Sequence, residues 1–536
     1  MIDDLGELPR GTRIAADICL IGGGAAGITI ARELAGGSAR VCLVDGGGLG
    51  YEEDSQALYD GACVGAPVAL QGGRLRFLGG STNHWGGRCA PMDEIDFRRR
   101  DWVPHSGWPM DRTELDPFYA RAQRVAGFSA PWRQDPQTLS YLKTELPAID
   151  ERWLKPFLWR YAPSNKDTGV WNWGLAYRQL LQESRNVRVL LHANFASFVT
   201  HAGERKRIRG VTVRSLNGTA ATITADKFVL CCGGLENARL LLLAAGQNGG
   251  GFGTEHDAVG RYFAQHSCGV GGVVASTELM STLQEQFNIL TGADGLEVEV
   301  GLALAPQVQE ERGVLNCSAF LEYQGDPDSG VAAAQDIWRS LLKGGWPPDV
   351  AQKAERIGAD LPAVLRGVAR RLSAGHTLEL ERSAGIPSRS ALVRLWLEQA
   401  PNPQSRISLA DELDALGLRR VKVDWRLGES ERRSAAAITT LIGAEFARLG
   451  IGRCRLEPWL QGEGVPLDQV LTESYHYIGA TRMSDDPSAG VVDRDCAVHG
   501  MRNLYVAGSS VFPTTGHANP TFTIIALALR LADHLR

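Results

Sequence analysis

The hydrophobic pattern of the first fifty residues predicts a strand, a turn, a helix and a second strand. Residues 18–21 form a short apolar run that is followed by glycines at 22–24. Apolar positions then recur at helical spacing over residues 28–34, and a second apolar run covers residues 41–44. Short apolar runs bounded by turn residues are typical of buried parallel strands, so we expect a β-α-β unit here.

The pattern changes to short strands after residue 194. Three segments have the alternation or composition of strands: residues 195–200, 211–213 and 222–224. Asn217-Gly218 between the last two is a strong hairpin signal. A core strand over residues 228–232 and a helix over residues 236–244 follow. We therefore predict a three-stranded meander inserted into the sheet that the first unit begins.

The rest of the chain predicts a second domain and a return to the first. Residues 333–373 are rich in helix-forming residues, with breaks at Gly344-Gly345 and Pro347-Pro348, and residues 392–397 and 421–425 have strand patterns. Residues 504–508 form a strand ending in glycine, and an apolar helix with proline at its start covers residues 520–535. The chain is thus expected to begin and end in the same sheet.

The predicted fold class is α/β, a discontinuous Rossmann-like dinucleotide-binding domain with an inserted α+β substrate-binding domain. We expect the dinucleotide-binding domain to comprise residues 1–130, 185–265 and 470–536. Residues 266–469 are expected to form the substrate-binding domain, with residues 131–184 as a connecting segment on the substrate side. A length of 536 residues suits two such domains.

Composition narrows the class of protein. The chain is 44% hydrophobic and 22% charged, which is ordinary for a globular protein, and its net charge of -5 does not suggest a nucleic-acid partner. No apolar run is long enough to span a bilayer, and the first residues lack a secretory pattern, so we expect a cytoplasmic protein. Ten cysteines without metal-like spacing are expected to be reduced thiols, and no metal site is expected.

The glycine turn carries the clearest chemistry. Gly22-x-Gly24-x-x-Gly27 follows a strand and opens a helix, the context in which this motif binds a dinucleotide pyrophosphate. Gly22 permits the tight turn, Gly24 lets the pyrophosphate approach the backbone, and Gly27 lets helix and strand pack closely. Asp45 at the end of the second strand is positioned to bind ribose hydroxyls. The motif alone does not distinguish FAD from NAD.

A second glycine-rich loop covers residues 79–87, with Asn83, His84 and Trp85 among its glycines. Such a loop lets the backbone pass close to a flat ring while side chains approach the edge of the ring. A structural turn with a hydrogen-bonded histidine is the alternative. Near the C-terminus, His476 offers a proton acceptor, and Asn519 stands just before the final helix as a polar partner.

Together these segments resemble the glucose-methanol-choline (GMC) oxidoreductases, and the pyranose oxidase-like sugar and glycoside oxidases among them. The resemblance rests on both glycine loops and on four further motifs: Glu398-Gln399-x-Pro401-Asn402-Pro403, His476-x-x-Gly479-Ala480-Thr481-Arg482-Met483, Gly508-Ser509-Ser510-Val511-Phe512-Pro513 and Asn519-Pro520-Thr521. Residues 265–390 match no motif of the family.

This resemblance implies FAD as the cofactor, hydride transfer from an alcohol carbon to flavin N5, and a catalytic pair of His476 and Asn519. His517 is the rival base, with a supporting role expected. In related proteins a histidine of a similar loop carries flavin covalently; Asn83 disturbs the match here, so we expect His84 to pack against the flavin without a bond. The expected cofactor-binding residues are Gly22, Gly24, Ala25, Ala26, Gly27, Asp45, Gly46, Gly80, Ser81, Asn83, His84, Trp85, Phe195, Gly233, Gly508, Ser509, Asn519 and Thr521.

The expected function is oxidation of a secondary hydroxyl of a sugar or glycoside to a ketone, with oxygen, a quinone or another molecule as electron acceptor. Two alternatives stay open: a lyase that retains FAD without net redox chemistry, and a non-catalytic flavoprotein. Trp171 and Trp173, with Gln399 and Asn402, are candidates for a surface that binds the sugar ring, although core tryptophans would look the same in the sequence.

Overall fold

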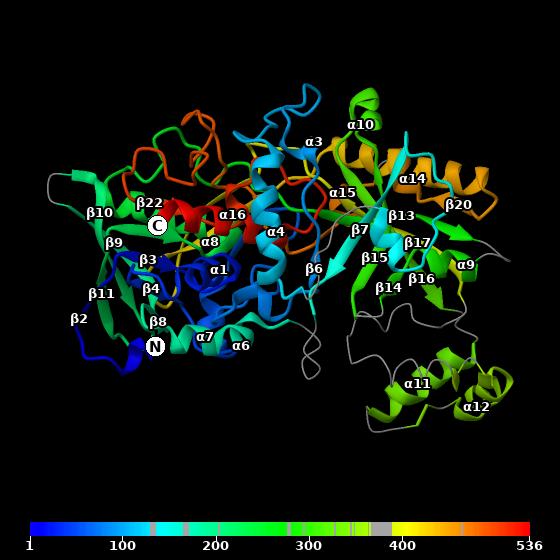
Figure 1. Ribbon diagram of the computed structural model, residues 1–536, viewed down its shortest axis with the longest axis horizontal. Helices are drawn as coiled ribbons and strands as arrows, with labels where there is room; N and C mark the ends of the chain where they lie inside the picture. Colours follow the sequence, from blue (N-terminus) through cyan, green and yellow to red (C-terminus); the bar gives the residue numbers. More distant parts are fainter. Residues whose placement is uncertain are drawn as a thin grey trace.

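The structure is a computed structural model that shows two sheet-based regions side by side (Figure 1). It describes residues 1–128, 136–163, 171–201, 204–275, 280–292, 295–325, 329–342, 346–347, 349–362, 364–365, 388–462 and 465–536. One region holds the N-terminal glycine turn and the last helix, and the other is built largely from the middle of the chain.

A six-stranded parallel sheet forms the centre of the first region. Its strand order is β1 (Ile2–Asp4), β8 (Val187–Leu191), β4 (Val41–Val44), β3 (Ile18–Ile21), β12 (Lys227–Leu230) and β22 (Leu504–Val506). All neighbouring strands run parallel. This confirms that strands from both ends of the chain share one sheet. β1 and β8 were not predicted.

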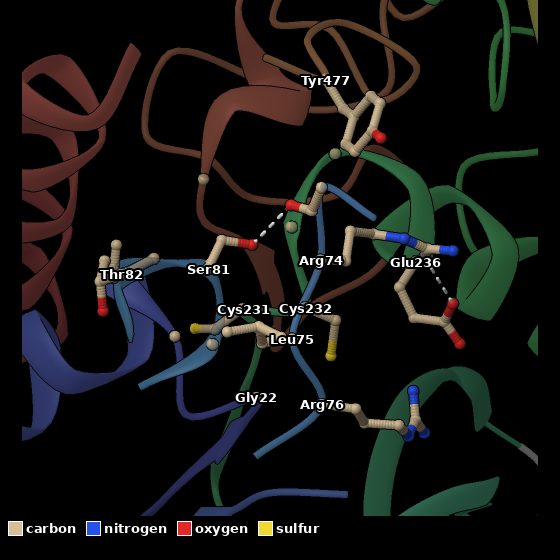
Figure 2. Close-up of a pocket in the computed structure, with 18 of the residues that line it drawn as sticks. Gly22, Arg74, Leu75, Arg76, Ser81, Thr82, Cys231, Cys232, Glu236 and Tyr477 are labelled. Atoms are coloured by element: carbon tan, nitrogen blue, oxygen red, sulfur yellow. Dashed lines mark hydrogen bonds and ion pairs between the residues drawn. The ribbon is translucent and has the colours of Figure 1, made fainter. Parts of the chain in front are cut away.

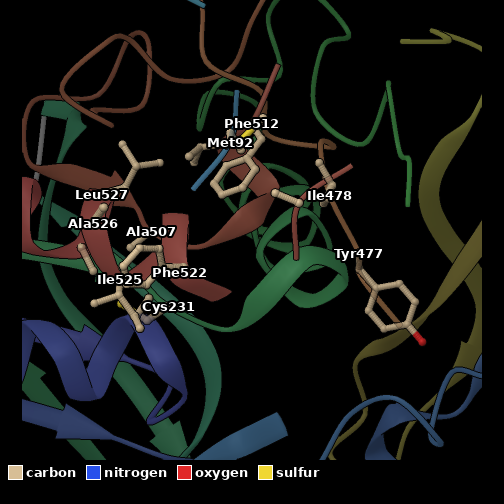
Figure 3. Close-up of a cluster of buried hydrophobic side chains, with 14 of the residues drawn as sticks. Met92, Cys231, Tyr477, Ile478, Ala507, Phe512, Phe522, Ile525, Ala526 and Leu527 are labelled. Carbon is tan, nitrogen blue, oxygen red and sulfur yellow. The ribbon is translucent and has the colours of Figure 1, made fainter. Parts of the chain in front are cut away.

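Three helices lie in this region (Figure 1): α1 (Ala25–Leu34), which contacts β3 and β4, α8 (Gly233–Asn248) and α16 (Pro520–Leu535). α16 contacts both α1 and α4 (Asp116–Val125). Phe522, Ile525 and Ala526 on α16 are almost fully buried and lie in a cluster that includes Phe512 and Cys231 (Figure 3). Burial of large apolar side chains on this scale is the main source of stability for the region.

The predicted meander forms a sheet of its own. Its order is β2 (Thr12–Ala15), β11 (Ala220–Thr224), β10 (Glu204–Arg214) and β9 (Asn194–His201). Asn217-Gly218 joins β10 to β11, with Gly218 at a φ of 86°. The prediction of three strands inserted into the main sheet was therefore wrong in two respects: the sheet is separate, and β2 adds a fourth strand parallel to β11.

A nine-stranded sheet forms the second region. Seven strands follow the order β20 (Arg453–Leu456), β13 (Ser267–Ala275), β17 (Ser388–Leu397), β16 (Cys317–Gly325), β15 (Glu297–Leu304), β7 (Leu154–Tyr161) and β6 (Arg88–Cys89); β14 (Ile289–Thr291) pairs with β15, and β21 (Thr472–Glu473) pairs with β13. α14 (Glu429–Arg448) contacts β7, β13, β16, β17 and β20. β6, β7 and β21 come from outside residues 266–469, so this sheet includes strands beyond the range expected for the substrate-binding domain. The domain boundaries stay a prediction.

A three-stranded sheet of β18 (Arg406–Leu413), β19 (Arg419–Trp425) and β5 (Gly61–Gly65) completes the strands. The helix-rich middle segment contains α11 (Gly330–Leu342) and α12 (Val350–Ala359); the predicted breaks at Gly344-Gly345 and Pro348 lie outside the described residues, as do residues 366–373. The shorter helices are α2 (Glu53–Gln56), α3 (Glu94–Phe97), α5 (Pro136–Tyr141), α6 (Trp173–Ala176), α7 (Arg178–Glu183), α9 (Met280–Gln286), α10 (Pro306–Arg312) and α15 (Leu467–Val470). Within the described part of the chain, none of the helices has the length and apolar character to cross a bilayer.

Candidate active site

A cavity of about 480 Å³ brings the N-terminal glycine turn together with the C-terminal polar pair. Gly22, Gly24, Ala25 and Ala26 line one part of it, and His476 and Asn519 line another. Figure 2 shows Arg74, Arg76, Cys231 and Cys232 around the part near the turn.

The geometry of the turn explains its three glycines. Gly22 has a φ of 109°, in the left-handed region that favours glycine. A β-carbon at Gly27 would lie 2.0 Å from the carbonyl oxygen of Gly22, so a side chain there would push helix and strand apart. A β-carbon at Gly24 would meet no atom within 4 Å. Gly24 is therefore open to the cavity, whereas Gly27 does not line it.

Asp45 lies at the end of β4 and lines the cavity, as does Gly46. Its Oδ2 accepts a hydrogen bond from Gly23 N at 2.8 Å, and its Oδ1 accepts one from Gly47 N at 3.0 Å. Burial raises the pKa of Asp45 above its ordinary value, although the two backbone donors oppose this. The carboxylate thus fixes the turn from inside.

The second glycine loop also reaches the cavity. Gly80, Ser81, His84 and Trp85 line it, and Ser81 Oγ donates to the carbonyl of Gly73 at 3.0 Å (Figure 2). His84 is exposed to the cavity, and partial burial lowers its pKa.

The structure places Asn83 outside the cavity lining, unlike its neighbours in the loop. Its Nδ2 donates to Leu78 O at 2.9 Å, and its Oδ1 accepts from Gly174 N at 3.1 Å. The amide therefore ties the loop to α6 and is unavailable to a ligand. The remaining predicted residues, Phe195, Gly233, Gly508, Ser509 and Thr521, all line the cavity.

His476 is held between two polar partners and an aromatic ring. His266 Nδ1 lies 2.8 Å from His476 Nδ1, and Asn519 Nδ2 lies 3.3 Å from His476 Nε2. The ring of Trp396 stacks on the imidazole with a centroid distance of 5.2 Å and an interplanar angle of 22°. Burial, with smaller contributions from His266 and Arg88, lowers the pKa of His476 well below its ordinary value.

Asn519 occupies the N-cap of α16, but its side chain makes no capping hydrogen bond. An asparagine at this position ordinarily accepts a backbone N–H of the first turn. Within the described part of the chain, Asn519 Oδ1 is buried without a hydrogen-bond partner. Its amide thus faces the cavity and His476, and Pro520 at the first helical position fixes the start of the helix.

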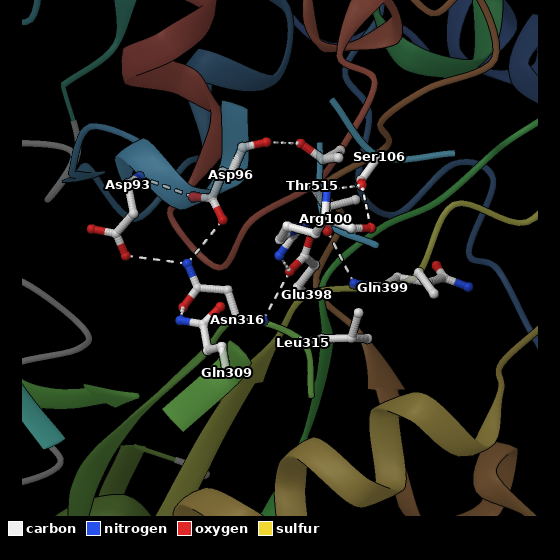
Figure 4. Close-up of polar contacts among 12 residues, drawn as sticks. Asp93, Asp96, Arg100, Ser106, Gln309, Leu315, Asn316, Glu398, Gln399 and Thr515 are labelled. Atoms are coloured by element: carbon white, nitrogen blue, oxygen red, sulfur yellow. Dashed lines mark hydrogen bonds and ion pairs between the residues drawn. The ribbon is translucent and has the colours of Figure 1, made fainter. Parts of the chain in front are cut away.

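His517 takes no part in lining the cavity. It is 1% exposed, its Nε2 lies 3.1 Å from Asp93 Oδ2, and its ring packs against Phe157. Asp93 in turn belongs to a buried polar network with Asp96 and Asn316 (Figure 4). This position suits a supporting role in the fold around the site.

The candidate sugar-binding residues Trp171, Trp173, Gln399 and Asn402 do not line the cavity, which agrees with the alternative of core tryptophans for Trp173. Trp173 is fully buried. Gln399 is 1% exposed: its Oε1 accepts from Gln265 N and Trp425 Nε1, and its Nε2 donates to Arg426 O. These groups hold the core together instead.

The cavity residues that sequence reasoning missed include Trp396, Arg88, Arg74 and Arg76, and it also missed His266, which contacts His476. His266 and Trp396 come from segments without a recognisable motif, and only the tertiary fold brings them to the site. Arg88 pairs with Glu299 at 2.5 Å and lies beside the rings of Phe320 and Trp396. Arg76 donates to Asn194 Oδ1 at 2.8 Å. The signal that could have indicated Arg74 and Arg76 is their charge next to a glycine loop.

The cavity suits FAD. The turn leaves Gly24 open where a pyrophosphate would approach, and two arginines carry positive charge beside it. At the other part of the cavity, Asn519 Oδ1 presents an acceptor that has no partner among the residues that the structure describes. Gly22–Ala26, Asp45 and Gly46 would hold the dinucleotide, and residues 80–85 and 519–521 would surround the ring.

Comparison with known proteins agrees with this arrangement. Residues 401–528 match the family described as "GMC oxidoreductase", and residues 17–252 match the family described as "FAD dependent oxidoreductase". The fructose dehydrogenase large subunit of Gluconobacter japonicus is 24% identical over 97% of this chain and 97% of its own length. The C-glycoside 3-oxidase of Microbacterium trichothecenolyticum is 33% identical over 24% of each chain.

Among solved structures, pyridoxine 4-oxidase from Mesorbium loti has a TM-score of 0.56 at 17% identity, covering 97% of this chain and 98% of that one. This likeness shows the shared fold. The two family matches, the full-length relative and the cavity between the glycine turn and the His476 pair lead to one assignment. The chain is an FAD-dependent oxidoreductase acting on CH–OH groups, and its residues 401–528 match the GMC oxidoreductase family.

Proposed function

We propose that this enzyme oxidises a secondary hydroxyl of a sugar or glycoside to a ketone, with His476 as the proton acceptor and Asn519 as its partner. The observation that carries the proposal is the 3.3 Å approach of Asn519 Nδ2 to His476 Nε2 at the wall of the cavity. Bound FAD would supply the acceptor for the hydride that leaves the alcohol carbon.

His476 has the properties of a base for this step. Its lowered pKa keeps the imidazole neutral at neutral pH, so a lone pair is available for the hydroxyl proton. Trp396 and His266 restrict the ring on two sides, which keeps its Nε2 directed at one place. A fixed base avoids the loss of orientational freedom at the moment of reaction.

Asn519 complements the base with both donor and acceptor atoms. Its Nδ2 can hydrogen-bond the substrate oxygen, while Oδ1 is a buried acceptor without a partner among the described residues. A buried acceptor is costly when it stays unpaired, so a hydroxyl-bearing ligand that satisfies it is favoured. A polyol provides such hydroxyl groups next to the carbon that is oxidised.

An aromatic ring and a charged group near His476 favour a sugar. Trp396 presents an apolar ring, and Arg88 adds donors fixed by Glu299 and Tyr161. Sugar rings commonly combine stacking on an aromatic face with hydrogen bonds from their hydroxyls. The names of the fructose dehydrogenase and C-glycoside 3-oxidase relatives support a carbohydrate substrate.

The test is anaerobic flavin reduction with a panel of sugars and glycosides, each paired with an analogue deoxygenated at one position. We expect bleaching by a carbohydrate, no bleaching by one deoxy analogue, and a product two hydrogens lighter that reacts as a ketone. An aldehyde product would overturn the assignment of a secondary hydroxyl. Bleaching by simple alcohols but by no carbohydrate would overturn the substrate class.

A further inference from the structure

A chain of three hydrogen bonds leads from a backbone carbonyl to the proposed base. Thr515 O lies 3.1 Å from His266 Nε2, His266 Nδ1 lies 2.8 Å from His476 Nδ1, and His476 Nε2 lies 3.3 Å from Asn519 Nδ2. Both imidazoles use both of their nitrogens. These hydrogen bonds therefore constrain which nitrogen of each ring carries the proton.

The donor and acceptor of each hydrogen bond follow from the first one, to the carbonyl oxygen of Thr515. A carbonyl oxygen can only accept, so His266 Nε2 must carry a proton and donate it to Thr515 O. A neutral imidazole has one N–H, which leaves His266 Nδ1 as an acceptor. The only donor available to His266 Nδ1 in this contact is His476 Nδ1–H. His476 Nε2 is then left with its lone pair, facing Asn519 Nδ2 and the cavity.

We propose that His266 is a positioning residue that locks His476 in the tautomer protonated on Nδ1, so that Nε2 is always the proton acceptor. This inference rests on the proposed function of His476. Without the lock, the opposite tautomer would place a proton on Nε2, which would deprive the substrate hydroxyl of its acceptor.

The surroundings of His266 keep this arrangement from reversing. His266 is fully buried, and burial lowers its pKa to about 4, so it is neutral at neutral pH. A second proton on His266 would turn Nδ1 into a donor and reverse the direction of its hydrogen bond with His476. The ring of His266 meets those of His476 and Trp396 edge-on, at interplanar angles of 85° and 84°.

The carbonyl of Thr515 belongs to a segment that is itself held by hydrogen bonds. Thr515 Oγ1 accepts from Gln399 N at 3.0 Å, and the adjacent Thr514 Oγ1 donates to Asp96 O at 2.7 Å (Figure 4). Trp108 Nε1 donates to Thr514 Oγ1 at 2.8 Å. The buried network thus provides a fixed acceptor from which the proton positions of both histidines follow.

The direct test is the tautomer of His476 in the FAD-loaded enzyme, from the ¹⁵N chemical shifts of histidine-labelled protein. His476→Gln identifies the signals by their loss. We expect a protonated Nδ1 and an unprotonated Nε2 in the wild type. In His266→Leu we expect signals of the opposite tautomer or of a mixture. A wild-type His476 protonated on Nε2 would overturn the proposal.

Kinetics provide the second test. His266→Leu is expected to lower the rate of anaerobic flavin reduction on the order of a hundredfold, because a base in the wrong tautomer is ineffective. His266→Gln is expected to restore the rate to within about tenfold of the wild type, because a carboxamide also offers one donor and one acceptor. Equal losses in the two variants would overturn the proposal.

A matched control is His499→Leu. His499 Nε2 contacts Ser484 O at 2.8 Å and does not line the cavity, so this variant also removes an imidazole bonded to a carbonyl. It is expected to keep the wild-type rate. Full activity in His476→Ala would instead defeat the proposed function, an outcome that the tautomer measurement distinguishes from failure of the lock.

Discussion

Asn519 Nδ2 lies 3.3 Å from His476 Nε2, although Asn519 stands at a helix N-cap where its side chain would ordinarily bond the first turn. The helix therefore lacks a capping hydrogen bond that typically stabilises it by about 1 kcal/mol. Departures of this kind from local structural preference concentrate at functional sites. The amide serves the cavity rather than the helix.

The first prediction concerns this pair. His476→Ala is expected to lower the rate of flavin reduction on the order of a hundredfold or more, because it removes the proton acceptor. Asn519→Ala is expected to be damaging in the same assay. Flavin content should stay unchanged in His476→Ala, which separates loss of chemistry from loss of cofactor.

His517→Ala is the comparison for these variants. His517 contacts Asp93 away from the cavity lining, so its replacement is expected to lower the rate less than either change in the pair. A fully active His476→Ala enzyme together with an inactive His517→Ala enzyme would move the role of base to His517.

The second prediction concerns pH. Because the pKa of His476 is well below its ordinary value of about 6.5, its neutral form persists as the pH falls through that range. The rate of flavin reduction is therefore expected to stay level from pH 8 to pH 6. A halving of the rate centred near pH 6.5 would contradict the burial of the base.

Burial also makes the stability of the fold depend on pH through His266. Its folded pKa is lowered to about 4, so the unfolded chain binds the additional proton between about pH 6.5 and pH 4. Protonation of the unfolded state destabilises the fold over this window as the pH falls. Compared with His266→Gln, the wild type is thus expected to lose stability more steeply on acidification, as measured by denaturant midpoints.

The third prediction concerns the glycine turn. Gly24→Ala is expected to fold, since its methyl group would meet no protein atom within 4 Å, but to retain little FAD because the methyl points where pyrophosphate approaches. Gly246→Ala on α8 is the matched control, because a β-carbon there also meets nothing within 4 Å. It is expected to bind FAD normally. Asp45→Ala is expected to weaken binding only. Normal FAD content in Gly24→Ala would place the pyrophosphate elsewhere.

The fourth prediction concerns His84, which is exposed to the cavity within the second glycine loop, directly after the short 3-10 helix of Gly80–Asn83. Acid precipitation of the yellow protein is expected to release flavin into the supernatant. Colour that stays with the pellet would mean covalent attachment. In either case His84→Ala is expected to change the potential or the retention of the flavin, and an unchanged spectrum, potential and occupancy would mean that the loop has another role.

The fifth prediction concerns the buried ion pair between Arg100 and Glu398. The two side chains are 1% and 0% exposed and make two hydrogen bonds, at 2.8 and 2.5 Å. Arg100→Met leaves Glu398 buried without its cation, which typically costs about 3–5 kcal/mol. Thermal unfolding measures the effect, and the control is Arg98→Met in the exposed pair with Glu94, where little change is expected.

Local patterns predicted the first region well because its elements have strong periodicity and clear ends. β3, α1, β4 and α16 match the predicted segments closely, since buried parallel strands and capped apolar helices are recognisable from sequence alone. The nine-stranded sheet was largely missed. Its antiparallel neighbours are distant in sequence, and pairing between distant strands leaves no local signal.

The residues of the candidate site also fall into those that the sequence predicted and those that it did not. Motif residues such as Gly24, His476 and Asn519 were predicted to share a site and do line one cavity. His266 was missed because nothing in its sequence neighbourhood distinguishes it from a core histidine. Its relation to His476 depends on the ring orientation and on a backbone carbonyl, and both are properties of the folded chain.

The pairing of β22 with β12, and of β12 with β3, joins segments from the two ends of the chain. Contacts between such distant segments must overcome a large loop-closure entropy before they are rewarded, so they form slowly. The glycine turn and His476 share a cavity only when these distant segments are paired. A cofactor that binds only this closed state would shift the equilibrium toward the folded chain by mass action, so bound FAD would stabilise the pairing of the two chain ends.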